Sequence, residues 1–256
     1  MARRMPKITT QPTTAISLSP AEVEAAAARL ATAEPDESLL WAWNHFGACA
    51  AIGTSFQGAG IVIMHLAHEL GLGFPVFTLD TGLLFPETLE LKQRLEERLG
   101  ISIESLRPEV GVAEQARLHG KALWDRDPDA CCTLRKVFPL REKLSSLNCW
   151  ITGLRREQSD TRANVGVVEL HEIEGLASHC VVKLNPLTHW SRERVWEYLR
   201  RHALPWNPLH DHGYRSIGCQ PCTHPTEQGG SERAGRWTGF GKTECGIHTF
   251  THKKTS

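Results

Sequence analysis

The sequence lacks an excess of charge of either sign, a long apolar run and an apolar leader. Lys+Arg and Asp+Glu both total 29 among 256 residues, so the overall charge does not favour nucleic-acid or membrane partners. No apolar run approaches the ~20 residues that span a bilayer. The N-terminus has no apolar core of signal-peptide length, so we expect a cytoplasmic, reducing compartment. Any anion-binding site must therefore be built from local groups.

Cysteine is the most informative residue type that is present. The chain has eight cysteines, and in a reducing compartment these are metal ligands or redox catalysts more often than disulfides. Cys131 and Cys132 are adjacent, and Cys219 and Cys222 form a CxxC motif. Four thiolates in two clusters suit a zinc ion or an iron–sulfur centre.

The adjacent pair favours an iron–sulfur cluster over zinc. Neighbouring residues on a helix diverge by ~100°, which makes Cys131 and Cys132 awkward ligands for one small ion. A [4Fe–4S] cluster instead offers a separate iron atom to each sulfur. Two alternatives remain: a zinc site, or a buried pair beside a CxxC motif that alone is redox-active.

Cys245 is the candidate nucleophile. It has no neighbouring cysteine in the sequence, and Lys242 and His248 flank it. Positive neighbours favour the thiolate, which is the reactive form of cysteine. An incidental surface cysteine is the alternative. Three other cysteines have apolar, strand-like surroundings and are expected in the core: Cys49, Cys149 and Cys180.

Apolar strands that alternate with helices predict an α/β fold with a doubly wound, mostly parallel sheet. Ser19 and Pro20 are typical of a helix start, and Gly100 of a helix end. The expected strands cover residues 48–53, 75–79, 101–106, 148–153 and 166–173. The expected helices cover residues 20–30, 36–46, 61–70, 86–99 and 191–202.

Three regions are expected along the chain. Residues 1–19 are expected to form a flexible segment, and residues 20–204 are expected to form an α/β nucleotide-binding domain. Residues 205–256 lose periodicity and are rich in Pro, Gly, His and Cys, which predicts a segment that carries cluster ligands and the reactive cysteine.

Several groups could bind an anion. Ligands of such sheets lie beyond the carboxyl ends of the strands, where the loops 54–60 and 80–85 are expected. Lys136 lies one helical turn after Cys132 and can share its face. Arginine forks suit phosphate or sulfate, although each arginine alone could be a solvated surface charge. The arginines in question are Arg155, Arg156, Arg162, Arg233 and Arg236.

Six ordered motifs together resemble the assimilatory adenylyl-sulfate reductase family, which is related to the phosphoadenylyl-sulfate reductases. The resemblance runs from Ala48 to His248. Its motifs are LDTGLLFPET (79–88), CCTLRKVFPL (131–140), ITGLRREQSDTR (151–162), GCQPCT (218–223), ERAGRW (232–237) and KTECGIH (242–248).

The resemblance implies an adenine-nucleotide α-hydrolase-like fold with a C-terminal catalytic tail. Cys245 would be the nucleophile, and a [4Fe–4S] cluster would be held by Cys131, Cys132, Cys219 and Cys222. The positions expected near the phosphosulfate are Lys136, Arg162, Arg233, Arg236 and His248. The positions expected in the two nucleotide loops are Ser55, Gln57, Gly58, Asp80, Thr81 and Gly82.

The implied reaction is the reduction of adenylyl sulfate in assimilatory sulfate reduction and cysteine biosynthesis. The Cys245 thiolate would take the sulfonyl group from AMP, and thioredoxin or a similar dithiol would release sulfite. A phosphoadenylyl-sulfate reductase, or an enzyme that takes both nucleotides, is the alternative. The cluster-free phosphoadenylyl-sulfate reductases lack the CC…CxxC set.

One loop departs from the family pattern. Iron–sulfur members often have a loop similar to SFSGAED, whereas residues 55–61 here read SFQGAGI, without the acidic pair and with Gln57 in place of a hydroxyl residue.

Two rivals belong to other functional classes. ATP-pyrophosphatase-type enzymes carry an SGGxDS-like loop, which is missing here. A zinc-stabilised binding module would be colourless, unlike an iron–sulfur protein. The sequence leaves the oligomeric state open, with a homo-oligomer among the options.

Overall fold

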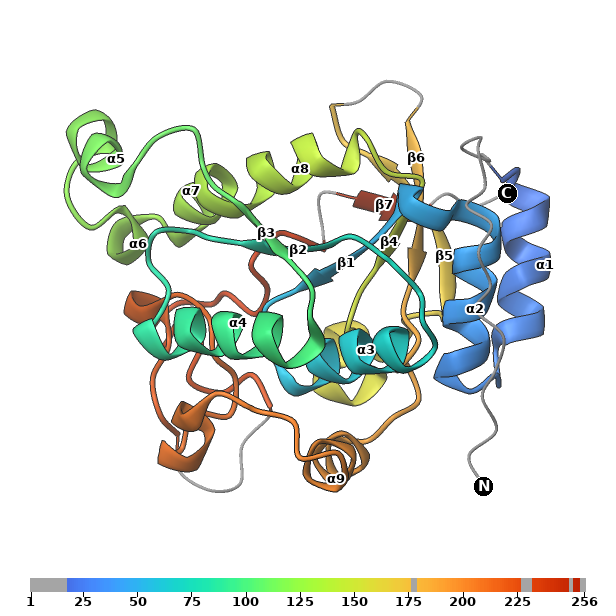
Figure 1. Cartoon of the computed structure of the whole chain (residues 1–256). Helices are drawn as coiled ribbons and strands as arrows, with labels where there is room; N and C mark the ends of the chain where they lie inside the picture. Colours follow the sequence, from blue (N-terminus) through green and yellow to red (C-terminus); the bar gives the residue numbers. More distant parts are fainter. Residues whose placement is uncertain (1–17, 176–178, 227–231, 249–250, 254–256) are drawn as a thin grey trace.

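A seven-stranded sheet forms the centre of the protein, which the computed structural model describes over residues 18–175, 179–226, 232–248 and 251–253. The strand order is β3-β2-β1-β4-β6-β5-β7 (Figure 1). The first five strands in this order run parallel, and β5 is antiparallel to both β6 and β7, which confirms the predicted α/β fold. The strands are β1 Ala50–Thr54, β2 Val76–Leu79, β3 Ile103–Leu106, β4 Cys149–Ile151, β5 Val168–Ile173, β6 Cys180–Leu184 and β7 Thr251–Lys253.

Local sequence signals set most helix ends. Ser19 and Glu22 form a capping box at the start of α1, and Gly100 ends α4 in the left-handed conformation. A π-helical segment, Thr133–Val137, joins α7 to α8. The helices are α1 Pro20–Leu30, α2 Pro35–Phe46, α3 Gly58–Glu69, α4 Pro86–Leu99, α5 Val112–His119, α6 Leu123–Arg126, α7 Pro128–Cys132, α8 Phe138–Leu144 and α9 Arg192–Arg201.

Helices cover both faces of the sheet. Ile52 and Ile151 belong to the core that β1 and β4 share with α3, α4 and α9. Ala51 and Trp150, one residue earlier in each strand, pack with α8 in the second core. This follows from the alternation of side chains along a strand. Figure 1 shows α8 above the sheet and α3, α4 and α9 below it, so the sheet is doubly wound.

The strand order reverses at β1, because β2 lies on one side of it and β4 on the other. Such a switch point opens a crevice at the carboxyl ends of the strands. Two glycines let the elements approach closely there. A Cβ atom on Gly53 would lie 2.5 Å from Trp150 Nε1, and one on Gly153 would lie 3.1 Å from the backbone nitrogen of Gly60. The crevice is therefore tightly bounded at its base.

The structure differs from the predicted elements in a few places. The first strand begins at Ala50 rather than at residue 48, because Gly47–Cys49 form a 3-10 turn. Strands β6 and β7 and the helices α5, α6, α7 and α8 were not expected. Strand β7 pairs with β5 at the edge of the sheet. Of the predicted flexible segment, residues 1–17 lie outside the described residues, and Ser19 caps α1.

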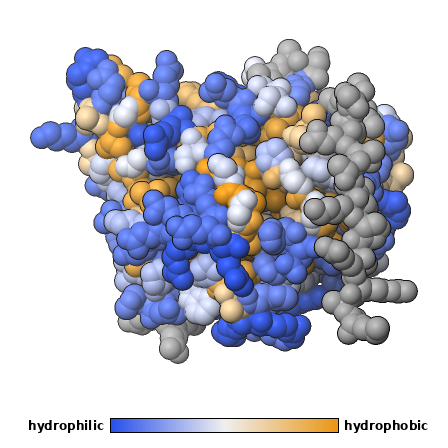
Figure 2. Space-filling view, viewed as in Figure 1, coloured by the Kyte–Doolittle hydropathy of each residue, from blue (hydrophilic) through white to orange (hydrophobic). Residues whose placement is uncertain are grey.

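Within the described ranges no helix is long and apolar enough to cross a bilayer. The face seen in Figure 2 is mostly hydrophilic, with smaller hydrophobic areas between the polar side chains.

Four histidines should make the fold less stable in mild acid. Burial lowers the pKa of His65, His171, His210 and His248. In the unfolded chain these groups titrate near about pH 6.5, so below that pH the unfolded state binds more protons. The free energy of unfolding should therefore fall as pH drops through this value, by at most about 1.4 kcal/mol per pH unit for each histidine.

Anaerobic urea unfolding at about pH 7.5 and about pH 5.5 measures this loss, in a window above the titration of ordinary carboxyl groups. The variant His171→Gln should show a smaller difference between the two pH values. An unfolding free energy that is equal at both would contradict the prediction.

Candidate active site

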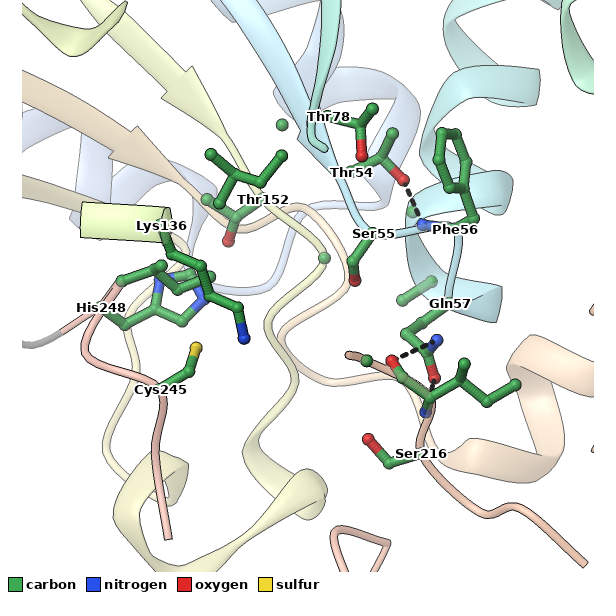
Figure 3. Close-up of a pocket in the computed structure, with 18 of the residues that line it drawn as sticks. Thr54, Ser55, Phe56, Gln57, Thr78, Lys136, Thr152, Ser216, Cys245 and His248 are labelled. Atoms are coloured by element: carbon green, nitrogen blue, oxygen red, sulfur yellow. Dashed lines mark hydrogen bonds between the residues drawn. The ribbon is translucent and has the colours of Figure 1, made fainter. Parts of the chain in front are cut away.

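One pocket occupies the crevice, and the C-terminal segment closes one side of it. The ends of β1, β2 and β4 line its base, and the β1–α3 turn lines a second side. Lys136 and Arg162 also line it, and the C-terminal segment contributes residues 216–219, Glu232, Arg233, Arg236, Cys245, Ile247 and His248. Figure 3 shows Lys136 and His248 beside Cys245, and the turn from Thr54 to Gln57 lies across the pocket with Ser216. Residues that are far apart in the sequence therefore meet around one cavity.

The β1–α3 turn is held in a strained shape. Phe56 has a positive φ of 57°, which is uncommon for a bulky residue, and its side chain is buried. Its backbone N–H donates to Thr54 Oγ1 at 3.0 Å. Ser55, which is predicted for the nucleotide loop, lines the pocket. The turn thus presents Ser55 and the N-terminus of α3, whose free N–H groups suit an anion.

Gln57 bridges this turn to the C-terminal segment. Its Nε2 donates to the Ile217 carbonyl at 3.1 Å, and its Oε1 accepts from the Ile217 N–H at 3.3 Å. The residue that departs from the family pattern thus holds the chain two positions before Cys219. Gly58, also predicted for this loop, lines a smaller neighbouring pocket with Arg155 and His210.

Of the three residues predicted for the second nucleotide loop, Asp80, Thr81 and Gly82, one lines the pocket. Thr81 lines the pocket, and its Oγ1 lies 3.2 Å from Cys219 Sγ. The Asp80 carboxylate instead pairs with Arg107 at 2.9 Å and accepts from the Gly82 N–H at 3.1 Å. Gly82 forms the turn at a φ of +67°. Neither Asp80 nor Gly82 lines the pocket.

Four buried cysteines lie close together beside the pocket. Burial raises the pKa of Cys131 and Cys132, and the neighbouring Cys219 thiol raises both further. Burial likewise raises the pKa of Cys222 to about 11. Gln115 Nε2 approaches Cys131 Sγ at 3.8 Å. In the described part of the chain, no three His, Cys, Asp or Glu side chains are arranged to hold a metal ion.

Cys245 is buried and lines the pocket next to Lys136. Burial disfavours its thiolate, but the charge of Lys136 and a hydrogen bond to the backbone of Ile247 outweigh this cost and lower the pKa of Cys245. Arg233 and Arg236 add to the effect. Because the thiolate is the nucleophilic form, this environment activates the sulfur.

Four of the positively charged side chains of the site lie around the indole ring of Trp237. Trp237 is buried, has a positive φ of 49°, and packs with Cys132, Cys222 and Cys245. Four cations lie over its ring at 4.5–6.0 Å, a distance at which cation–π attraction offsets part of their mutual repulsion. They are Lys136, Arg233, Arg236 and Lys242.

The other predicted basic residues have different partners. Arg162 makes two hydrogen bonds of 2.9 Å to the Glu244 carboxylate. Arg155 binds both carboxylate oxygens of Glu232, at 2.9 and 2.6 Å. The His248 ring stacks on Trp150, with ring centroids 5.1 Å apart. Burial and nearby cations hold the pKa of His248 well below its usual range, so its imidazole is neutral near pH 7.

Two acidic residues of the site were missed by sequence reasoning. Glu232 lines the pocket, and Glu244 pairs with arginines at its edge. Both stand inside family motifs, ERAGRW and KTECGIH, in which the arginines and the cysteine carry the predicted chemistry. Thr152, Gln158 and Trp150 also line the pocket, and no local signal distinguishes them from ordinary strand and loop residues.

Two named relatives are similar to this chain over most of its length. The adenosine 5'-phosphosulfate reductase of Salinibacter ruber is 48% identical over 216 residues, which cover 84% of each chain. Adenosine 5'-phosphosulfate reductase 1 of Bacillus subtilis is 45% identical over 211 residues, which cover 82% of this chain and 88% of that one.

Solved structures are similar as well. A phosphoadenylyl-sulfate reductase from Candida auris, in a phosphate complex, is similar with a TM-score of 0.69 and 28% identity, covering 81% of this chain and 98% of that one. The Candida glabrata FMN adenylyltransferase, at 13% identity and a TM-score of 0.53, shares the fold alone.

The model of the phosphoadenosine phosphosulfate reductase domain matches residues 50–225, which include the nucleotide loops and all four paired cysteines. The resemblance seen in the six sequence motifs is thereby confirmed: the chain belongs to the phosphoadenosine phosphosulfate reductase family.

Proposed function

We propose that this protein reduces adenylyl sulfate to sulfite and AMP in assimilatory sulfate reduction. The observation that carries the proposal is the position of Cys245, whose activated thiol lines the same pocket as the turn after β1 and the cations Lys136, Arg233 and Arg236. The names of the relatives from Salinibacter and Bacillus point to the same substrate.

The pocket would bind the nucleotide across the strand ends. Ser55 and Thr81 line the side formed by the two loops, and Lys136, Arg162 and Arg236 line the side that would receive the phosphosulfate. Arginine and lysine bind such oxyanions through charge-assisted hydrogen bonds. They would also stabilise the negative charge that develops on the departing phosphate. His248, held neutral, can donate one ring N–H to the same group.

The reaction would run through a covalent sulfur intermediate. The Cys245 thiolate attacks the sulfur of the sulfonyl group, the new S–S bond forms, and the S–O bond to AMP breaks with its electron pair on AMP. A thiolate of reduced thioredoxin, or of a similar dithiol, then attacks Cys245 Sγ, and sulfite leaves with the electron pair. The second thiol of the dithiol resolves the mixed disulfide and restores the Cys245 thiolate. A reducing compartment such as the cytoplasm would supply this partner.

We further propose that Cys131, Cys132, Cys219 and Cys222 hold a [4Fe–4S] cluster. The donor set fits this group, because four buried sulfurs come from two segments and have polar donors beside them at Thr81 and Gln115. The cluster would supply an electrostatic charge next to the pocket and a clamp between α7 and the C-terminal segment. Lys136, which is buried, would offset that charge. Burial lowers the pKa of Lys136, but the negative charge of the thiolates of Cys219, Cys132 and Cys245 outweighs this cost and raises that pKa.

Sulfite release by anaerobically purified protein tests the proposal, with reduced thioredoxin and either adenylyl sulfate or phosphoadenylyl sulfate. We expect activity that strongly favours adenylyl sulfate. A preference for the 3′-phosphorylated nucleotide would favour the second candidate, which the similarity to the Candida auris enzyme supports. No sulfite from either nucleotide, in protein shown to contain iron, would contradict both.

A further inference from the structure

Glu244, the residue immediately before Cys245, occupies two of the arginines that face the pocket. Arg162 donates through Nε to Oε1 and through Nη2 to Oε2, each at 2.9 Å. Arg233 Nη2 lies 3.2 Å from the same Oε2, and Thr161 Oγ1 donates to Oε1 at 3.2 Å. The side chain of Glu244 is 14% exposed and that of Arg162 is 11% exposed, so both ion pairs are shielded from water.

The arrangement resembles that of a bound oxyanion. A fork-to-fork contact with Arg162 and a second arginine on one oxygen is the geometry that a phosphate or a sulfonate adopts. The contact with Arg233 is incomplete, because its Nη2 makes no hydrogen bond among the described residues although it is buried. A tetrahedral group, with three oxygens, could satisfy both arginines better than a planar carboxylate.

Other cations of the pocket have no such partner. Within the described ranges neither Lys136 nor Arg236 has a carboxylate at ion-pair distance, so both are available to an incoming anion. Among the pocket cations that the structure describes, Arg162 and Arg233 are therefore the two that must exchange one anion for another when the substrate binds.

We propose that the Glu244 carboxylate is an internal stand-in for the substrate's oxyanion: it holds Arg162 and Arg233 in the unliganded protein and is displaced by the phosphosulfate. The proposal rests on the proposed function and adds a coupling to it. Since Glu244 and Cys245 are adjacent, displacement of the carboxylate frees the peptide that carries the nucleophile at the moment the sulfonyl group arrives. Glu244 is thus a positioning residue rather than a group that reacts.

The test is the affinity of the intact, iron-containing protein for inorganic sulfate in the presence of saturating AMP, measured by anaerobic titration calorimetry. In the variant Glu244→Gln the amide can still accept from Arg162 but no longer competes as an anion. We expect sulfate to bind about tenfold more tightly to this variant than to the wild type. A purely structural role for Glu244 predicts the opposite, because loss of a structural ion pair would weaken the site.

Glu157→Gln is the matched control. It removes the same charge from the neighbouring loop, where Glu157 is half exposed and lies 4.0 Å from Arg155. We expect its affinity for sulfate to stay within about twofold of the wild type. Unchanged or weaker sulfate binding by Glu244→Gln would overturn the proposal, and so would an equal gain in Glu157→Gln.

A measurement on the wild type keeps the proposal testable if the variant fails to fold. Addition of AMP with sulfate should raise hydrogen exchange of the peptide 242–248, because its carboxylate anchor is displaced. Slower or unchanged exchange would overturn the proposal. Both measurements use binding rather than sulfite release, so they can succeed even if the reaction differs from the one proposed.

Discussion

Replacement of Cys245 with serine should lower sulfite release by about 10³-fold or more, while AMP binds with an affinity within about twofold of the wild type. The hydroxyl group of serine is a much weaker nucleophile than a thiolate, and the charges that lower the pKa of Cys245 cannot ionise an alcohol near neutral pH. AMP would bind through the strand ends and the other cations, which the substitution leaves in place.

The measurement is single-turnover release of AMP and sulfite by anaerobic protein, followed by mass analysis of the chain. Wild-type protein without a reductant should accumulate a sulfonate on Cys245, and the serine variant should accumulate none. Cys49→Ser is the matched control, because Cys49 is half-buried in the turn before β1 and does not line the pocket. Normal turnover by Cys245→Ser would refute the mechanism.

Replacement of Cys219 with serine should remove most of the iron and lower sulfite release by about 100-fold or more. Cys219 lies close to the other three cysteines: the charge of its thiolate raises the pKa of Cys131, Cys132 and Cys222, and Thr81 contacts its sulfur. Without the cluster, α7 would lose its proposed link to the segment around Cys219, although Gln57 would still hold Ile217. We therefore expect lower stability together with lower activity.

Iron and zinc content, visible absorption and urea unfolding check this prediction on the same preparations. Cys49→Ser again serves as the control and should keep its iron and its colour. Wild-type protein that is colourless and contains one zinc ion would instead favour the zinc alternative. Full iron content in Cys219→Ser would remove Cys219 from the ligand set without affecting the proposal for Cys245.

Much of the fold could be predicted because its signals are local. The capping box at Ser19, the left-handed Gly100 and the Ser191 cap of α9 act within one turn of helix, so the printed sequence contains the whole signal. The short strands β6 and β7 lack such signals. Their identity depends on pairing with β5, which is remote in the sequence from β7.

The candidate site also has features that the sequence could predict and contacts that it could not. Residue types and spacing pointed to four cysteines as metal ligands and to Cys245 as a candidate nucleophile, and the resemblance of the six motifs added the basic residues near the phosphosulfate. These roles stay predictions. The sequence could not reveal that Gln57 binds the backbone of Ile217, or that Asp80 pairs with Arg107 and does not line the pocket. Each of these contacts joins segments that only the folded chain brings together.

Glu244 shows the difference most clearly. From the sequence it is a polar residue beside a reactive cysteine, and the two arginines that it occupies are 82 and 11 positions away. By itself, the sequence predicted an α/β fold, the strands β1 to β5, the helices α1 to α4 and α9, and the kinds of chemical group at the edge of the sheet. Only the tertiary structure decided which charges are paired and which face the pocket. Ion pairing depends on distances of a few ångströms, and the separation of two residues along the chain does not give the distance between them in the folded protein.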